Sequence, residues 1–414
     1  MADKSQTEMR AGGQPPTRGD TSRGGPARAQ ERAREGADEV AGPPPQIKVA
    51  IVHDWLVGGG AERVVYELHK MFPDAPIYTT YATKEWQERL DGKVITGFLQ
   101  RWPFSKLRKF LPLLHIWWFT HLDLSGYDLI ISSTGNGSAK GVRVPKGAAH
   151  ICYCHSPTHF YWRHYDQYMK NPGFGALNSL ARLALRSLAR PLRKWDYAAA
   201  QRTDYFIANS SHIQKDIKTY YGRDAAVIHP PVDIERFALA PRGERTGFVS
   251  FSRLVPAKRV DILVQAATRL NVPLTVISTG PELERLRRMA GPSVTFLGKV
   301  SDEEVAKQVA RAQAFLFASF DDFGIVAVEA MAAGTPVIAY KAGGALDYIE
   351  PGKTGLFFDE QTVDSLVRTL ESFDEKQFNH EYISKCATQF SDQAFRDQMR
   401  QYIATVLQER DERV

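Results

Sequence analysis

The sequence of 414 residues is poor in cysteine, and this shortage excludes two classes of protein. Its three cysteines are Cys152, Cys154 and Cys386, and none has the C-x-x-C spacing of a zinc site or redox pair. Three cysteines in a chain of this length also do not make a disulfide-stabilised scaffold. We therefore expect no metal site, and a reducing cytoplasm fits the composition.

Long apolar runs are also missing. None reaches the roughly 18 residues that a membrane-spanning helix needs, and the first residues lack the apolar core of a signal peptide. We expect a cytoplasmic protein, with any membrane contact peripheral and at the inner face of the cell membrane.

A strong charge of one sign is absent as well. Lysine and arginine total 53 against 47 acidic residues, a net charge of +6. This balance suggests an anionic ligand or surface, although a plain basic surface explains it equally well, and it does not indicate nucleic acid as a partner.

The length predicts two domains of α/β size. Residues 1–46 are rich in Gly, Pro, Ala, Arg and Glu without apolar periodicity, so we expect a disordered tail, with a nucleic-acid arm as the weaker alternative. A double proline places the interdomain hinge at 222–240. We predict an N-terminal domain over 47–228 and a C-terminal domain over 229–393, with the helix 394–414 packing back on the first domain.

Short apolar runs alternate with helical patterns in both halves, which predicts two doubly wound parallel sheets. The predicted strands lie in the segments 47–55, 76–82, 93–98, 127–134, 150–156, 203–210, 246–252, 273–280, 294–298, 314–319, 335–340 and 354–358. Ligands of such sheets bind at the carboxyl ends of the strands. Five residues fall just beyond predicted strands and are expected to line one crevice: Asp54, Gly58, Ser133, His155 and Asn209.

The first strand runs into the turn Gly58, Gly59 and Gly60, which is followed by an amphipathic helix over 61–72. A glycine turn before a helix offers free backbone N–H groups and the positive end of the helix dipole to an anion. The turn lacks the full G-x-G-x-x-G pattern of a dinucleotide site, so a tight turn without a ligand is an equal alternative.

The stretch 314–350 carries the chemistry around which the second half is organised. Asp321 stands before a helix that begins near Phe323, Gly324 and Ile325, and Glu329 stands inside it, seven residues separating the acids. A charge in the apolar run VAVEAMAA needs a partner.

These groups suit a nucleotide diphosphate. Glu329 can accept both hydroxyls of a ribose, and Asp321 can accept hydroxyls of a second ring. Arg253 and Lys258 follow the strand 246–252, and with the helix amides they can bind the diphosphate.

Two segments combine basic and apolar residues. The segment 101–120 mixes Lys and Arg with Leu, Trp and Phe. The segment 178–195 places four arginines at helical spacing, namely Arg182, Arg186, Arg190 and Arg193. Such helices can lie on an anionic membrane surface, or they can be ordinary surface helices with solvated arginines.

The motifs SRLVPAKRVD, GPELERL, FLGKVSDEE, FDDFGIVAVEAMAAGTPVIAYKAGG and TGLFF resemble, in this order, the C-terminal domain of retaining glycosyltransferases of family four, which have the GT-B fold. The motifs HDWLVGGGAERV, SGYDLIIS, YCHSP and IANS resemble the mannosyltransferase branch that builds O-antigen and exopolysaccharide. The likeness covers residues 47–405. It implies two Rossmann-like domains that face each other across a cleft.

The resemblance also implies roles for matching residues. Glu329 would bind the nucleotide ribose, and Asp321 would contact the sugar, although the family usually has Glu there and Asp322 is a possible substitute. Arg253 and Lys258 would neutralise the diphosphate, and His155 would lie near the transferred sugar. Other donor-binding positions would be Gly58, Gly59, Gly60, Phe323, Gly324, Ile325 and Gly298.

We therefore expect a retaining hexosyltransferase of cell-surface polysaccharide synthesis. By resemblance its donor is GDP-mannose and its acceptor a saccharide, with a polyprenyl-diphosphate-linked saccharide suiting the basic segments. No cofactor and no divalent metal are expected. The alternatives are a UDP-sugar donor, another GT-B enzyme such as a phosphorylase or epimerase, and a non-catalytic nucleotide-sugar-binding protein.

Overall fold

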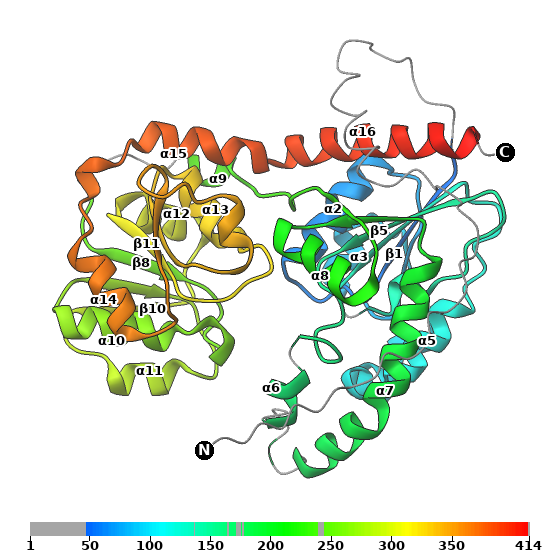
Figure 1. Ribbon diagram of the computed structural model, residues 1–414, viewed down its shortest axis with the longest axis horizontal. Coiled ribbons are helices and arrows are strands. Elements are labelled where there is room, and N and C mark those ends of the chain that lie inside the picture. Colours follow the sequence, from blue (N-terminus) through cyan, green and yellow to red (C-terminus); the bar gives the residue numbers. More distant parts are fainter. Residues whose placement is uncertain are drawn as a thin grey trace, which may run out of the picture.

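A computed structural model describes residues 47–412, except 136, 164, 171–174, 176–177 and 239–243. The tail predicted over 1–46 lies outside the described residues. Two parallel sheets, each flanked by helices, form the two halves of the molecule (Figure 1).

The first sheet has seven strands in the order β3-β2-β1-β4-β5-β6-β7. Every neighbouring pair is parallel. The strands are β1 (Val49–His53), β2 (Ile77–Thr79), β3 (Val94–Thr96), β4 (Leu129–Thr134), β5 (Ala149–Cys154), β6 (Tyr205–Ala208) and β7 (Ala226–Val227). This order is that of a Rossmann-like doubly wound fold.

The second sheet has six strands in the order β10-β9-β8-β11-β12-β13, again all parallel. The strands are β8 (Phe248–Phe251), β9 (Leu274–Ile277), β10 (Val294–Gly298), β11 (Ala314–Phe317), β12 (Val337–Tyr340) and β13 (Gly355–Phe358). All twelve predicted strand segments are confirmed. The two-residue strand β7, inside the predicted hinge, was not predicted because two residues carry no periodicity.

Most of these strands are apolar throughout because helices cover both faces of each sheet. The longer helices are α2 (Gly60–Met71), α5 (Pro112–Thr120), α7 (Asn178–Arg202), α8 (Ser211–Tyr221), α10 (Val260–Leu270), α12 (Asp302–Arg311), α13 (Ile325–Ala332), α14 (Val363–Glu371), α15 (His380–Ala387) and α16 (Asp392–Asp411). The shorter ones are α3 (Lys84–Arg89), α4 (Phe104–Leu107), α6 (Tyr165–Lys170), α9 (Glu235–Ala238) and α11 (Leu283–Met289). Ser301 caps the start of α12, since its Oγ accepts a hydrogen bond from Glu304 N at 3.2 Å.

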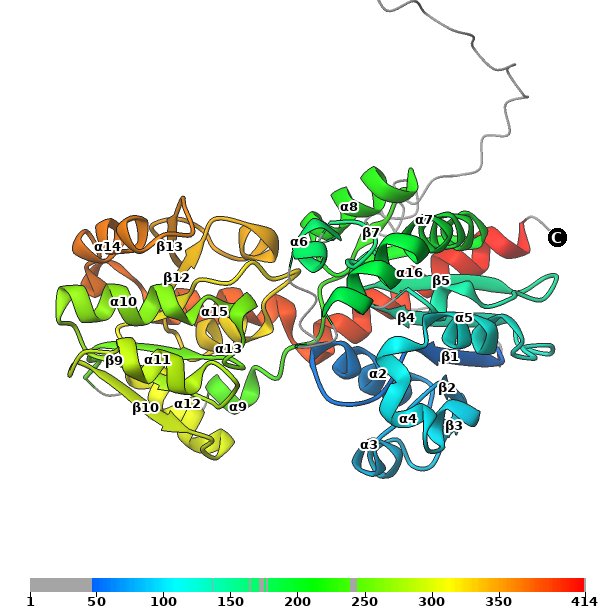
Figure 2. The ribbon, with the colours of Figure 1, turned by 90° about the horizontal axis from the view of Figure 1, so that it is seen from below.

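The last helix, α16, returns from the second sheet to the first (Figures 1 and 2). It begins beside the bond from Val232 N to Phe390 O, at 2.9 Å. Its apolar face then joins the core of the first sheet through Phe395, Met399, Tyr402, Ile403 and Val406. The exact domain boundaries drawn from the sequence stay predictions.

The basic face predicted for 178–195 is only partly present. Arg186 and Arg190 are exposed, but Arg182 donates to the carbonyl oxygens of Met169 and Lys170, at 3.1 and 3.3 Å. Arg193 donates to Tyr161 O and lies 4.6 Å from the ring centre of Tyr165. Residues that precede α7 in the chain therefore bind Arg182 and Arg193, and only part of the predicted basic face remains solvated.

No helix in the described part of the chain combines the length and the apolar character required to cross a membrane.

A buried carboxylate ties α7 to the elements around it. Asp196 accepts hydrogen bonds from Trp162 Nε1 at 2.8 Å, Tyr221 Oη at 2.7 Å and Thr158 Oγ1 at 3.0 Å, and it pairs with Lys140. Both charged side chains are almost fully buried. Removing one partner of a buried ion pair leaves the other charge without compensation.

We therefore predict that Asp196→Ala lowers the free energy of unfolding by about 3–5 kcal/mol. The measurement is urea denaturation, followed by the fluorescence of the first domain. The control is Asp224→Ala, which removes the exposed partner of Lys218 at 2.8 Å and should change stability little. Equal losses in both variants would contradict the role of the buried pair.

Candidate active site

In each sheet the strand order reverses beside the first strand, between β1 and β4 and between β8 and β11. Ligands of doubly wound sheets bind outside the carboxyl ends of the strands at such switch points. The predicted residues His155 and Gly58–Gly60 follow strands of the first sheet, while Arg253, Lys258, Asp321 and Glu329 follow β8 and β11 of the second. The structure thus supplies two edges that can each hold part of a ligand.

The two domains touch where α2 and α13 begin. A Cβ atom placed on Gly60 would come within 2.8 Å of Ile325 Cδ1, so the two helix starts lie in close contact and a larger residue at position 60 would displace the end of the Ile325 side chain. The positive ends of two helix dipoles therefore meet at this point. We call the contact made by Gly60, Arg63, Ile325 and Glu329 the domain junction.

The glycine turn is less open to an anion than the sequence suggested. Glu62 Oε1 accepts the amide hydrogen of Gly58 at 2.9 Å and that of Val57 at 3.2 Å. An acid in the first turn of a helix is favoured by the dipole, and here it binds the Gly58 amide, one of the amides that were expected to be free. Gly58 has φ 113°, a left-handed conformation that suits glycine.

Glu329 is buried, and arginines from both domains bind it. Arg63 Nη2, on α2, lies 2.9 Å from Glu329 Oε1, and Arg236 Nη2, on α9, lies 3.3 Å from the same oxygen. Burial raises the pKa of Glu329 above its ordinary value, while the two guanidinium groups act in the opposite direction. The sequence required a partner for this charge but gave no sign that one would come from the other domain.

Beside Glu329 two guanidinium nitrogens are buried without a hydrogen-bond partner among the described residues, Arg63 Nη1 and Arg236 Nε. Buried donors are nearly always paired in native proteins. A ligand rich in acceptor oxygens would satisfy both.

Asp321 and Lys258, predicted for different parts of the donor, form an ion pair. Lys258 Nζ donates to Asp321 Oδ2 at 2.5 Å, and both side chains are largely covered. Arg253 is exposed, and no ion pair among the described residues involves it. An arriving diphosphate would therefore meet one solvated cation and compete with Asp321 for the other.

Asp322, the possible substitute for Asp321, faces the opposite domain. Its Oδ1 lies 3.8 Å from Arg163 Nη1, and the Arg163 guanidinium lies 5.1 Å from the ring centre of Phe320. Desolvation raises the pKa of Asp322 to about 7, although Arg163 acts to lower it. The two neighbouring acids thus point to different partners.

The start of α13 depends on Gly324, which has φ 93°. A Cβ there would lie 2.8 Å from Tyr348 Oη and 2.9 Å from Phe317 Cζ. The Phe323 side chain packs in the core against Tyr348, so only its backbone could serve a ligand. Gly298, with φ 69°, ends β10 at the far edge of the sheet.

His155 follows β5 at the carboxyl edge of the first sheet. Its Nε2 lies 2.8 Å from Ser133 Oγ, and His53 Nδ1 lies 3.1 Å from the same hydroxyl. Desolvation of the ring, with a smaller effect of His53, lowers the pKa of His155 to about 3, so the ring is neutral near pH 7.

Two of the residues expected in the crevice are buried and already hydrogen-bonded within the first domain. Asp54 is buried and accepts hydrogen bonds from Thr134 Oγ1 at 2.9 Å and from the amides of Gly135 and Ala139 at 3.0 and 2.9 Å. It holds the loop after β4, because buried amides need an acceptor. Asn209 is also buried, and its Oδ1 accepts a hydrogen bond from Ser210 Oγ at 3.3 Å.

A second contact between the domains involves Asp347, at the end of the 3₁₀ turn η6 (Gly343–Asp347). Its carboxylate accepts the Ser211 amide at 2.7 Å, at the start of α8, and contacts Ser211 Oγ and, at 3.1 Å, His229 Nε2. Burial would raise the pKa of Asp347, but these hydrogen bonds outweigh it and hold the pKa below its usual value. Neither this contact nor those of Arg63 and Arg163 was predicted, because each joins residues far apart in sequence.

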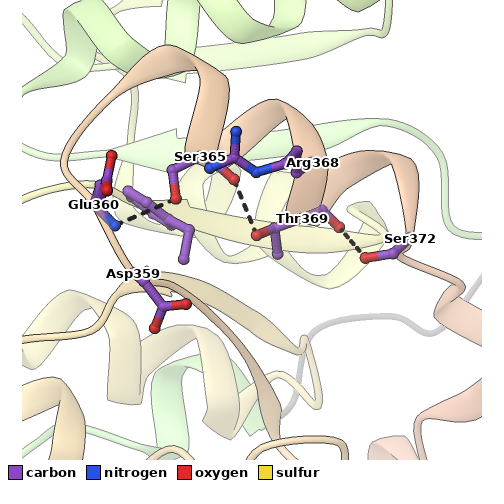
Figure 3. Close-up of a pocket in the computed structure, with 7 residues that line it drawn as sticks. Asp359, Glu360, Ser365, Arg368, Thr369 and Ser372 are labelled. Carbon is purple, nitrogen blue, oxygen red and sulfur yellow. Dashed lines mark hydrogen bonds between the residues drawn. The ribbon is translucent and has the colours of Figure 1, made fainter.

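A surface pocket of about 330 Å³ lies elsewhere (Figure 3). It is lined by Phe358, Asp359, Glu360, Ser365, Arg368, Thr369 and Ser372. The hydroxyls of Thr369 and Ser372 donate to carbonyl oxygens of α14, and Ser365 Oγ accepts the Glu360 amide at 3.2 Å. None of the predicted site residues lines this pocket.

The domain junction and the two strand edges together carry cations, helix N-termini and two carboxylates. Such a set can neutralise an anionic group while its carboxylates accept hydroxyl hydrogens. Among the residues that the structure describes, no three His, Cys, Asp or Glu side chains gather in an arrangement that could hold a metal ion.

The comparisons with known proteins agree with this geometry. Residues 58–236 match the family described as Glycosyltransferase Family 4, and residues 231–390 match Glycosyl transferases group 1. Each half of the chain therefore matches a glycosyltransferase domain, and the two matches together span residues 58–390. The predicted GT-B fold is confirmed.

Among characterised relatives, the chain is 34% identical over 193 residues to the GDP-mannose-dependent alpha-(1-6)-phosphatidylinositol monomannoside mannosyltransferase of Mycobacterium tuberculosis, covering 39% of this chain and 50% of that protein. It is 29% identical over 215 residues to the D-inositol 3-phosphate glycosyltransferase of a Nocardioides species, covering 42% and 47%. The chain thus spans about half the length of the curated relatives that it matches.

Two solved structures share the fold over most of the chain. Anabaena HepE in complex with UDP has a TM-score of 0.63 at 20% identity, covering 87% of this chain and 100% of that one. Sucrose-phosphate synthase from Thermosynechococcus elongatus has a TM-score of 0.64 at 18% identity, covering 87% and 99%.

The domain junction predicts that Arg63 helps to hold the two domains together. Arg63→Ala removes one of the two guanidinium groups that neutralise Glu329, so the domains should separate more easily. We expect a larger radius of gyration in small-angle X-ray scattering of the protein without nucleotide. Lys84→Ala, which alters a solvated lysine of the same domain, is the control. Identical scattering curves for Arg63→Ala and the parent protein would contradict the prediction.

Proposed function

We propose that the protein is a retaining, metal-independent hexosyltransferase that moves mannose from GDP-mannose onto a saccharide acceptor in cell-surface polysaccharide synthesis. The observation that carries the proposal is the set of charges at the domain junction and the β8 and β11 edge: Arg253, Lys258, Asp321 and Glu329 beside the start of α13. A protein that only bound a nucleotide sugar, or that served only as a scaffold, would not need this full set of two acids and two cations.

Each group has a defined task in this proposal. Glu329 accepts the two ribose hydroxyls, and the ribose takes over the place that Arg63 and Arg236 now share. Lys258, Arg253 and the amides of α13 bind the diphosphate. Asp321, released from Lys258, accepts hydroxyls of the sugar, and His155 contacts the same ring from the other domain.

The reaction breaks the bond between the anomeric carbon and the phosphate oxygen and forms a bond from that carbon to the acceptor oxygen on the same face. The acceptor's hydroxyl proton passes to the departing phosphate. Negative charge grows on the phosphate, and in this proposal Lys258, Arg253 and the helix amides stabilise it. This arrangement assigns no step to a divalent metal.

GDP-mannose is favoured as donor because the relatives that are 34% identical use it by name. A UDP-sugar is the alternative donor. The acceptor is proposed to be lipid-linked, such as a polyprenyl-diphosphate saccharide, which would bring the enzyme to the inner face of the cell membrane.

Lys258→Ala should lower kcat for mannose transfer by about 10²–10³, the loss typical of removing one stabilising group from a developing negative charge. The control is Lys353→Ala, which removes an exposed lysine paired with Glu350 in the same domain. The assay uses radiolabelled GDP-mannose and UDP-glucose with a lipid-linked acceptor extract, with and without a chelator. Near-wild-type transfer by Lys258→Ala at saturating donor would exclude the assignment, and loss of activity with chelator would exclude the metal-free mechanism.

The membrane part of the proposal is supported by exposed apolar side chains among basic ones. Trp102 is 76% exposed and Trp117 50%, with Arg101 and Lys106 exposed nearby. Leu180 and Leu183 are 64% and 62% exposed at the start of α7, whose Arg186 and Arg190 also face solvent. Both α5 and α7 pack against the same 3₁₀ turn, η3 (Ala139–Gly141), so the two groups lie on one domain. Tryptophan and arginine together suit the interface of an anionic bilayer.

Reversing Arg186 and Arg190 to Glu should weaken binding to vesicles containing phosphatidylglycerol by at least about tenfold, since each basic residue near such a surface contributes about 1 kcal/mol. Vesicle flotation measures the bound fraction. The matched control reverses Arg287 and Arg288, two exposed arginines of α11 in the other domain. If both double variants float as the parent does, this surface does not bind the membrane.

A further inference from the structure

Three adjacent strands of the first sheet end in a chain of hydrogen-bonding side chains. His53 is the last residue of β1, Ser133 lies in β4, and His155 directly follows β5. In the sheet β4 lies between β1 and β5, as Figure 2 shows, and His53 and Ser133 are register partners. His53 and Ser133 are buried, whereas His155 is partly exposed.

The proton positions in this chain follow from its geometry. His53 Nδ1 lies 2.9 Å from the Ser133 carbonyl oxygen, which can only accept, so Nδ1 carries a hydrogen and donates it. The same N–H lies 3.1 Å from Ser133 Oγ, which therefore acts as an acceptor toward His53. The hydrogen of the Ser133 hydroxyl is left for another partner.

That partner is His155 Nε2, 2.8 Å from Ser133 Oγ. If Nε2 instead carried a hydrogen, Ser133 Oγ would accept from both rings, and its own hydrogen would have no acceptor among the described residues. A buried donor without a partner is costly, so the arrangement in which Ser133 donates to Nε2 is preferred. The hydrogen bond at one ring nitrogen decides which nitrogen carries the proton.

We infer that Ser133, held in place by His53, is a positioning residue that fixes His155 in the tautomer with the hydrogen on Nδ1. His155 then offers an N–H donor to an oxygen of the transferred sugar and has no second donor. This use of Nδ1 rests on the proposed function, whereas the tautomer itself does not. Nδ1 has no hydrogen-bond partner among the described residues, yet it is not one of the buried unpaired atoms, so it is open to a ligand.

The effect of desolvation agrees with this assignment. It lowers the pKa of His155 to about 3, so the ring does not gain a second hydrogen near neutral pH. A donor at Nδ1 and an acceptor at Nε2 therefore coexist on a neutral ring.

The neighbouring residue of β4 supplies a matched control. Ser132 Oγ lies 2.8 Å from His150 Nε2, so β4 carries a second serine that is hydrogen-bonded to a histidine, one residue before Ser133. Successive residues of a strand point to opposite faces, and both Ser132 and His150 are buried. Ser132→Ala thus makes the same chemical change in the same strand without touching His155.

The test is nitrogen NMR of the full chain labelled with ¹⁵N-histidine, with His155 assigned by its loss in His155→Gln. In the parent protein Nδ1 should resonate as a protonated nitrogen and Nε2 as an unprotonated one. Ser133→Ala should move His155 toward the form protonated on Nε2, Ser133→Thr should retain the parent pattern, and Ser132→Ala should leave His155 unchanged. A proton on Nε2 in the parent protein, or the parent pattern in Ser133→Ala, would overturn the inference.

Kinetics add a readout that separates this inference from the proposed function. Ser133→Ala should lower kcat for sugar transfer by about tenfold and leave the dissociation constant for GDP unchanged, because the nucleotide is held by the other domain. If the protein shows the predicted tautomer but has no transferase activity, the proposed function is wrong and the positioning role of Ser133 still stands. An unchanged kcat in Ser133→Ala, despite a changed tautomer, would show that Nδ1 is not used on the sugar.

Discussion

Glu329 is a buried carboxylate, and a buried charge persists only where partners compensate it. One partner, Arg236, comes from its own half of the molecule, and the other, Arg63, comes from the opposite half. The position at which a ribose is expected is therefore also the position at which the two domains attract each other. If Glu329 binds the ribose as proposed, nucleotide binding and domain closure compete for the same oxygen atom.

The same logic extends along the junction. Lys258 is paired with Asp321, and Arg163 faces Asp322, so each predicted acid already has a partner of opposite charge. A nucleotide sugar carries both anionic and hydroxyl groups and can replace these internal pairs one for one. The charged side chains of the site are already paired with one another before a ligand binds, and the charges of the ligand can compensate them afterwards.

Much of this could be predicted from the sequence, and the failures have identifiable causes. Apolar runs located every strand of four or more residues, because helices cover both sheet faces. The position of an acid beside a strand end did not by itself predict a ligand contact. Asp54 follows β1, as a ligand group would, yet it accepts hydrogen bonds from the amides of a loop. Periodicity placed Arg193 with Arg186, but only the folded chain shows that Arg193 contacts Tyr161 and Tyr165.

Contacts between the domains lay beyond any sequence argument. Arg63 is adjacent to Glu62 in an ordinary amphipathic helix, and nothing in its neighbourhood indicates a partner on α13. Such pairs depend on how two separate sheets are set against each other, which no local pattern records.

The course of α16 determines how such an enzyme can be recombined. The helix belongs by sequence to the second half, yet its apolar face completes the core of the first. The second sheet is in effect an insertion into the first domain, bounded by the contact between Val232 and the residues that precede α16. An exchange of donor specificity between relatives would therefore require two crossover points, one on each side of this insertion. A chimera joined at a single point would pair the first sheet with a foreign terminal helix.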